Sequence, residues 1–385
     1  MFNEPVQPGN PMRNANRLKL GLFAPNCSSG LAVTKAPERW DASWPHNVQL
    51  AQLCDAAGIE FLLPIARWKG YGGETDFEGE TWETITWAAG LLAATRNLTV
   101  FGTVHVALVH PIFAAKQFVT VDHIGAGRFG LNIVCGWNQD DFDMFGVAQR
   151  EHDSRYDYGE EWWRIVRRLW TSDAPFDFAG RYISLKAAIG KPKPRALPVV
   201  MNAGASGAGR AFGARNCDFL FTKLVDMEQG RKEVAAVKDV AAGFGRAVDV
   251  FASSHVVLRP TRKQADEYYR WYSDELADWE AVDRLIALQG LYTQSLPPDG
   301  YRKFRQRFAA GHGTYPLVGD ADHIAAELHR MTQVGFAGTA MGFVNYLDEF
   351  PAFAAEVLPR LERLGLRVPA AAASELEPRG NDAAK

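Results

Sequence analysis

Polar side chains near the end of an apolar run in the middle of the chain are the first candidates for chemistry. The stretch RFGLNIVCGWNQDDFDMFG (128–146) carries Asn132 inside the run, then a Cys-Gly-Trp corner and a group of acidic and amide residues. The carboxamide of Asn132 can donate and accept hydrogen bonds at once, which suits a ligand edge bearing both carbonyl and N–H groups. A buried asparagine that satisfies nearby backbone groups is the alternative, and this residue alone does not decide between the two.

A turn of small residues is a candidate phosphate site. In NAGASGAGRAFG (202–213) a strand-like segment leads through Ala205, Ser206 and Gly207 into a helix. Backbone N–H groups at a helix N-terminus bind anions, and small side chains let the ligand approach them. A dinucleotide fold fits poorly, because the spacing is not G-x-G-x-x-G and no strand-terminal acid follows at about 20 residues. An ordinary strand-to-helix turn remains the alternative.

Two further segments offer donors for an anion. EHDSRYDYGEEWWRIV (151–166) opens a helix with the planar guanidinium of Arg155 and the phenol of Tyr156. The acidic residues around them equally suit the solvated first turn of an ordinary helix. ARWKGYGGETDF (66–77) brings Arg67 together with three glycines that permit a sharp loop. A plain loop is the alternative there.

Metal and hydrolase chemistry find little support. The cysteines lie far apart without a C-x-x-C pair, which indicates buried free thiols: Cys27, Cys54, Cys135 and Cys217. His105 and His110 stand five residues apart on or just after a strand and therefore tend toward opposite faces. No G-x-S-x-G elbow occurs. We assign no metal and no serine nucleophile.

Composition indicates a globular, enzyme-sized protein. With 385 residues, 47% hydrophobic, the chain can bury a large core. The net charge of -3 comes from interspersed acids and bases, so no basic footprint for nucleic acid or an anionic membrane is present. The N-terminal residues contain charges and prolines where a signal peptide needs an apolar core, and no apolar run approaches about 18 residues. A cytoplasmic protein with a small-molecule partner is expected.

The elements that must position these side chains alternate between strands and helices. Short apolar runs predict strands at 18–24, 60–65, 98–104, 129–135, 197–202, 218–222, 248–258 and 338–343. Segments of helical period separate most of them, for example 48–57, 82–94, 112–123, 158–170 and 321–332. Eight strands with intervening helices favour an α/β fold of the (β/α)8 barrel type, whose chemistry lies at the carboxyl ends of the strands.

The order of predicted strands and helices also indicates how the chain is divided into a barrel and two terminal segments. We expect a flexible N-terminal arm over 1–16, a single barrel over 17–368 and a flexible tail over 369–385. Insertions are expected around 172–196, which contains a hairpin, and around 281–316, near the active face.

In this order and context the motifs resemble those of the bacterial-luciferase-like, flavin-dependent monooxygenases. Within them the chain is most similar to the group of the pyrimidine and dimethyl-sulfone monooxygenases, over about 18–366. The stretches that carry the resemblance are HPIFAAKQFVTVDHIGAGRFGLNIVCGW (110–137), EHDSRYDYGEEW (151–162), NAGASGAG (202–209) and GFVNYLDEFPAFAAEVLPRL (342–361). The fold of that family is a (β/α)8 barrel with insertions, in agreement with the strand count.

The resemblance implies site residues one by one. It implies FMN contacts at Ala66, Arg67, Asn132, Arg155, Tyr156, Ser206 and Gly207. Thr103 matches a threonine that flanks the oxygen-reactive edge of the flavin together with the strand-four asparagine, so Thr103 and Asn132 are the predicted catalytic residues. Asp141 stands where the family has a flavin-contacting glutamate, and its shorter side chain puts that contact in doubt.

The resemblance also implies the reaction. Reduced FMN (FMNH2), supplied by a separate NAD(P)H:flavin reductase, would react with O2 and form a peroxide at flavin N5. That species cleaves C–N, C–S or C–halogen bonds in small heterocyclic, amide, sulfone or halogenated substrates. A homo-oligomer, dimer or tetramer, is expected. The alternatives are an F420-dependent oxidoreductase of the same superfamily and a flavin-binding barrel without catalysis; Thr103 together with Asn132 favours oxygen chemistry.

Overall fold

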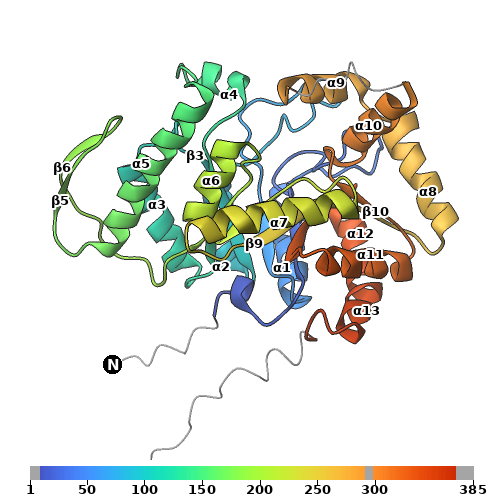
Figure 1. Cartoon of the computed structure of the whole chain (residues 1–385). Coiled ribbons are helices and arrows are strands. Elements are labelled where there is room, and N and C mark those ends of the chain that lie inside the picture. The colour runs from blue at the N-terminus through green and yellow to red at the C-terminus, as the bar shows by residue number, and fades with distance from the viewer. Residues whose placement is uncertain (1–8, 291–297, 370–385) are drawn as a thin grey trace, which may run out of the picture.

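The computed structural model describes residues 9–290 and 298–369. Its parallel strands form a closed ring, which lies behind α6 and α7 in Figure 1. The strands of the ring are β1 (Lys19–Phe23), β2 (Phe61–Leu63), β3 (Thr99–His105), β4 (Phe129–Val134), β7 (Val199–Asn202), β8 (Phe219–Phe221), β9 (Asp249–Leu258) and β11 (Gly338–Gly342). They pair in the order β11-β1-β2-β3-β4-β7-β8, and β9 closes the ring by pairing with both β8 and β11. The predicted (β/α)8 barrel is confirmed, with strand ends that lie within two residues of the expected ones.

Helices follow the strands and form the outer layer. They are α1 (Trp44–Ala56), α2 (Thr84–Ala94), α3 (Pro111–Ile124), α4 (Gln139–Met144), α5 (His152–Thr171), α6 (Gly207–Asn216), α7 (Met227–Gly243), α11 (Ala321–Gln333), α12 (Tyr346–Glu356) and α13 (Leu358–Arg363). Several begin at a polar residue whose side chain accepts a hydrogen bond from the first turn, namely Ser206, Asp226, Asp320 and Asn345. No helix in the described ranges combines the length and apolar character needed to cross a lipid bilayer.

Aromatic rings fill the lower half of the barrel because glycines on neighbouring strands make room for them. A Cβ added to Gly21 of β1 would lie 2.3 Å from the ring of Phe61 on β2. A Cβ on Gly130 of β4 would lie 2.4 Å from the ring of Phe101 on β3. The rings of Phe61 and Phe251 meet edge to face, with centroids 5.9 Å apart. Since side chains alternate along a strand, the residues two positions further on point into the barrel above this aromatic floor.

Residues 9–16, part of the segment expected to be a flexible arm, pack against the base of the barrel. They contain the short 3-10 helix η1 (Pro11–Arg13), whose Met12 is only 2% exposed. Asn14 donates a hydrogen bond to Oε1 of the buried Glu60, and Arg367 binds Oε2 at 2.6 Å. A buried carboxylate requires such donors, and this requirement holds the segments around Asn14 and Arg367 at the base of the barrel. The expected tail, 369–385, and residues 1–8 lie almost wholly outside the described part.

Two excursions leave the barrel. The first is the hairpin β5 (Phe176–Ala179) and β6 (Ser184–Ala188), which projects to the left in Figure 1. The second begins earlier than the expected 281–316 and comprises α8 (Arg262–Arg270), η2 (Trp271–Glu275), α9 (Trp279–Leu288), α10 (Pro298–Gly311) and β10 (Tyr315–Gly319). Its α9 reaches α4, where Arg284 and Asp140 form an ion pair at 2.6 Å. The second excursion therefore borders the carboxyl-terminal face of the barrel.

Candidate active site

Two neighbouring strands bring Thr103 and Asn132 together above the aromatic floor. The two residues are direct partners in the pairing of β3 with β4. Asn132 Nδ2 donates to Thr103 Oγ1 at 3.1 Å, and Thr103 Oγ1 donates to the carbonyl of Pro64 at 2.7 Å. Thr103 is 5% and Asn132 9% exposed. The pair is thus preorganised by the sheet itself.

The carbonyl of Pro64 decides which way the amide of Asn132 faces. Because the hydroxyl hydrogen of Thr103 is committed to that carbonyl, its oxygen must accept a hydrogen bond from the amide N–H of Asn132. Oδ1 and the second N–H of Asn132 are therefore left for a ligand. This is the donor-and-acceptor pair that the sequence predicted for a cofactor edge.

His105 shares the same strand and the same inward side. It is 7% exposed, and its Nδ1 has no hydrogen-bond partner among the described residues. Burial, with a smaller effect from the nearby Arg67, lowers the pKa of His105 to about 4. The site therefore contains a neutral imidazole beside Thr103, which sequence reasoning considered only as half of an unsupported metal pair. Within the described ranges no three His, Cys, Asp or Glu side chains could hold a metal ion.

A buried ionic cluster holds Arg67. Its guanidinium donates to Glu78 at 3.2 Å, to Asp141 at 3.4 Å and to the Tyr71 hydroxyl at 2.6 Å. The other carboxylate oxygen of Asp141 accepts from the backbone N–H of Trp68 at 3.2 Å. Asp141 is fully buried, so it orients the loop after β2. The structure thus commits most donors of Arg67 to protein groups.

Glu78 links this cluster to the second excursion. Its Oε1 lies 3.8 Å from Nε2 of His312, and neither atom has a hydrogen-bond partner among the described residues. Burial raises the pKa of Glu78 and lowers the pKa of His312 to about 3. The low pKa of His312 favours a neutral imidazole beside Glu78. No sequence signal marks this contact, because it joins segments more than 200 residues apart.

The N-terminus of α6 opens on the same rim, since β4 and β7 are neighbours. Ser206 caps the helix by accepting from the backbone N–H of Gly209 at 3.1 Å. The phenol of Tyr156 lies against this turn and interacts with the Ser206 side chain. A Cβ added to Gly207 would meet no atom within 4 Å, so the helix end faces open space. Exposed N–H groups beside two hydroxyls fit the phosphate of FMN.

Arg155 fastens the start of α5 to the corner after β4. Its Nη1 donates to the carbonyl of Gly136 at 3.1 Å, and its Nε donates to the carbonyl of Arg150 at 2.7 Å. A guanidinium has five N–H donors, so these two bonds leave others for an anion. The side chain is half-buried, on the segment that also supplies Tyr156.

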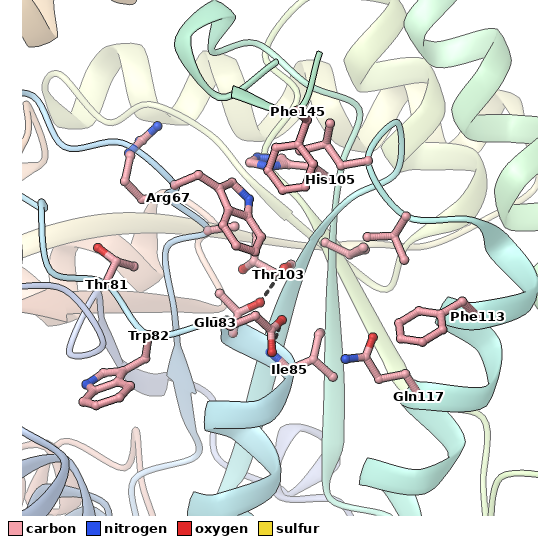
Figure 2. A pocket seen from close by; sticks show the side chains of 16 residues that line it. Arg67, Thr81, Trp82, Glu83, Ile85, Thr103, His105, Phe113, Gln117 and Phe145 are labelled. Carbon is pink, nitrogen blue, oxygen red and sulfur yellow. Dashed lines mark hydrogen bonds between the residues drawn. The ribbon is translucent and has the colours of Figure 1, made fainter. Parts of the chain in front are cut away.

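A cavity of about 270 Å³ reaches Thr103 from the side of α2 and α3. Figure 2 shows Arg67 and His105 above Thr103, Trp82 and Glu83 on one side, and Phe113 and Gln117 on the other. Ala66 also lines the cavity. The predicted site residues that follow the second strand, Ala66 and Arg67, therefore meet Thr103 of the third strand here. Phe113 and Gln117 carry no mark in the sequence that distinguishes them from the outer face of an ordinary helix.

Comparison with known proteins agrees with this architecture. The chain is 31% identical to an FMNH2-dependent dimethylsulfone monooxygenase of Pseudomonas fluorescens (strain Pf0-1), over 93% of this chain and 98% of the relative. It is 30% identical to the pyrimidine monooxygenase RutA of Methylobacterium radiotolerans, over 94% and 97%. Among solved structures, riboflavin lyase RcaE superposes with a TM-score of 0.82 at 23% identity, covering 91% and 93% of the two chains.

DmoA from Hyphomicrobium sulfonivorans also superposes with a TM-score of 0.82, at 20% identity and with 91% and 89% coverage. These two superpositions support the fold. The family model described as luciferase-like monooxygenase matches residues 18–338, most of the barrel. The resemblance predicted from the motifs is thereby confirmed, and the chain belongs to the luciferase-like monooxygenase family.

Proposed function

We propose that this protein is an FMNH2-dependent monooxygenase that uses O2 to oxygenate and cleave a C–N, C–S or C–halogen bond in a small substrate. The observation that carries the proposal is the Thr103–Asn132 pair, held by β3 and β4 on the same rim as the open N-terminus of α6. The FMNH2-dependent relative at 31% identity supports the same cofactor. The substrate types are those anticipated from the sequence: heterocycles, amides, sulfones and halogenated molecules.

Each group in the site has a physical task. When bound, reduced FMN supplies the electrons that activate O2. The first N–H groups of α6, with Ser206 and Tyr156, hold the phosphate. Asn132 presents Oδ1 and an N–H to the ring edge, and Thr103 keeps a hydroxyl beside it. The aromatic floor below excludes water, which strengthens every polar contact above it.

We also propose a partner protein, a location and an oligomeric state for the enzyme. A protein that consumes FMNH2 needs a separate NAD(P)H:flavin reductase as partner, because its site has to exchange oxidised for reduced flavin. We place the protein in the cytoplasm as a homo-oligomer. Ala66, Arg67 and Asp141 remain proposed flavin neighbours, with Asp141 acting through Arg67 and Trp68.

The purified protein is expected to contain little flavin and to bind FMNH2 in preference to NADH. Anaerobic titration with FMNH2 and, separately, with reduced F420, followed by admission of air with a panel of the proposed substrates, should give oxygenated product only for FMNH2. Product analysis and peroxide assays measure this result against a protein-free control, in which FMNH2 oxidises spontaneously to FMN and H2O2. Rapid reduction of a tightly bound flavin by NADH alone, or turnover with reduced F420, would count against the two-component monooxygenase.

A pair of matched substitutions at Ser206 tests the phosphate site without removing the helix cap. Asp and Asn both cap helices well, so Ser206→Asp and Ser206→Asn should keep the melting temperature. Only Asp adds a negative charge next to a bound phosphate, and we expect it to weaken FMN binding by at least about tenfold relative to Asn. Fluorescence titration with FMN measures the difference. Equal FMN affinities of the two variants would show that the phosphate does not bind at the N-terminus of α6.

A further inference from the structure

The cavity beside Thr103 is lined mainly by apolar side chains. Ile85 and Val104 form its buried part, and Leu108 and Val109 are half-buried in the wall. Aromatic residues form its rim and remain exposed: Trp68 at 43%, Trp82 at 44%, Phe113 at 63% and Phe145 at 41%. A cluster of exposed aromatic side chains around a hollow marks a ligand site. Ligand pockets usually run from roughly 300 to 1,000 Å³, so a cavity of about 270 Å³ fits a small ligand.

The described residues that line the cavity offer no unpaired positive charge. Among the described residues that line it, Arg67 is the cation, and Glu78 and Asp141 already bind its guanidinium. Glu83 adds a carboxylate at the entrance, where it accepts hydrogen bonds from the backbone N–H groups of Ile85 and Thr86. An anion entering here would lose its hydration and face net negative charge.

Besides the unpaired Nδ1 of His105, the amide of Gln117 is an uncommitted polar group among the described residues of the wall. Gln117 lies one turn after Phe113 on α3, and both side chains project toward Ile85 across the cavity (Figure 2). Gln117 is half-buried, and its amide makes no hydrogen bond to another described residue. An amide that can both donate and accept matches a neutral polar group such as an amide, a lactam edge or a sulfone oxygen.

We infer that this cavity is the substrate pocket and that it selects small, neutral, largely apolar molecules, with Gln117 binding their one polar group. The inference deepens the proposed function and rests on it for the role of Thr103, which the cavity reaches. It divides the candidate substrates: uncharged amides, heterocycles and sulfones fit the pocket, whereas carboxylates and sulfonates of the same size do not.

The test compares neutral ligands with anionic ligands of nearly the same shape. Binding of dimethyl sulfone and methanesulfonate, and of benzamide and benzoate, is measured by calorimetry on the protein without flavin and again with FMN. The neutral member of each pair should bind at least about tenfold more tightly, because a carboxylate or sulfonate loses its hydration without gaining a cation. Tighter or equal binding of the anions overturns the inference, and so does failure of both neutral ligands to bind in either condition.

A substitution at Gln117 tests the polar contact. Gln117→Leu keeps the size of the side chain and should weaken binding of both neutral ligands by about three- to tenfold, the loss typical of one neutral hydrogen bond. The matched control is Gln52→Leu on α1, an exposed glutamine outside the cavity, which should change nothing. Unchanged binding by Gln117→Leu overturns the role of Gln117.

The binding test and the proposed function can fail separately. Calorimetry without flavin reports the preference of the pocket even if the protein oxidises nothing. An intact preference for neutral ligands, combined with no FMNH2-dependent formation of oxygenated product, would refute the monooxygenase and leave the pocket assignment standing. Efficient FMNH2-dependent turnover of the anionic ligands would refute the pocket assignment and leave the monooxygenase standing.

Discussion

Alanine in place of Thr103 or Asn132 is expected to lower the rate of product formation by on the order of 10² to 10³. Asn132 is a preorganised donor near developing negative charge, which contributes that much to rate, and Thr103 is the acceptor that orients it. The affinity for FMNH2 should fall far less, since one ordinary hydrogen bond contributes about 0.5–1.5 kcal/mol. Reduced flavin would then be oxidised without product, and H2O2 would be released. The measurement is product formed per FMNH2 oxidised, with H2O2 counted.

The controls follow from the hydrogen bonds of the pair. Thr103→Ser keeps the hydroxyl that donates to Pro64 and accepts from Asn132, so it should retain most of the coupling. Thr103→Ala leaves the Pro64 carbonyl without this donor, and thermal unfolding will show whether the fold persists. Wild-type coupling in both alanine variants on an active substrate would make Asn132 a structural amide and remove the oxygen-site assignment.

Acid is expected to destabilise the folded protein through three buried histidines. Burial lowers the pKa of His105 to about 4 and the pKa values of His255 and His312 to about 3. In the unfolded chain each imidazole takes up a proton near its ordinary pKa of about 6.5. The stabilising contribution is therefore complete above about pH 6.5 and is lost as the pH falls toward the folded values.

Between pH 6.5 and 4.5 the free energy of unfolding is expected to fall by about 2.5 kcal/mol for each histidine, from a slope near 1.4 kcal/mol per pH unit. Domains are stable by roughly 5–15 kcal/mol, so the sum is large enough to unfold the chain. Buried carboxyls act in the opposite direction, because burial raises the pKa values of Glu78, Asp122 and Glu349. As the pH falls, the folded chain takes up these protons at a higher pH than the unfolded chain does, and this uptake stabilises the folded chain in acid.

Urea unfolding at pH 7.0, 6.0, 5.5 and 5.0 measures this dependence. His255→Gln should be less stable at neutral pH, because it loses the stacking on Tyr269, yet its stability should fall less steeply with acid. His46→Gln, at an exposed histidine on α1 that contacts Asp41, is measured alongside for comparison. Equal slopes for wild type and His255→Gln would show that His255 is protonated in the folded chain.

The alternation of elements could be predicted from the sequence, and particular segments show why. The strand containing Asn132 is recognisable because an apolar run ends in a Cys-Gly-Trp corner, and the α6 turn because small residues precede a helix. Both signals are local. The second excursion starts at α8, and the sequence does not mark this start, because α8 has the composition of any exposed helix and only its departure from the barrel after β9 distinguishes it.

The sequence by itself determined the barrel, the family and the identity of the residues at the strand ends, since hydrophobic periodicity and motifs are properties of neighbouring residues. Only the tertiary structure decided how these residues are paired. Glu78 binds the guanidinium of Arg67 and also lies 3.8 Å from His312, which belongs to a loop far away in the chain. The hydroxyl of Thr103 faces Pro64, and this contact sets the orientation of Asn132. Burial, hydrogen-bond direction and the charge of a cavity depend on which segments become neighbours in space, and that information exists only once the ring of strands has closed.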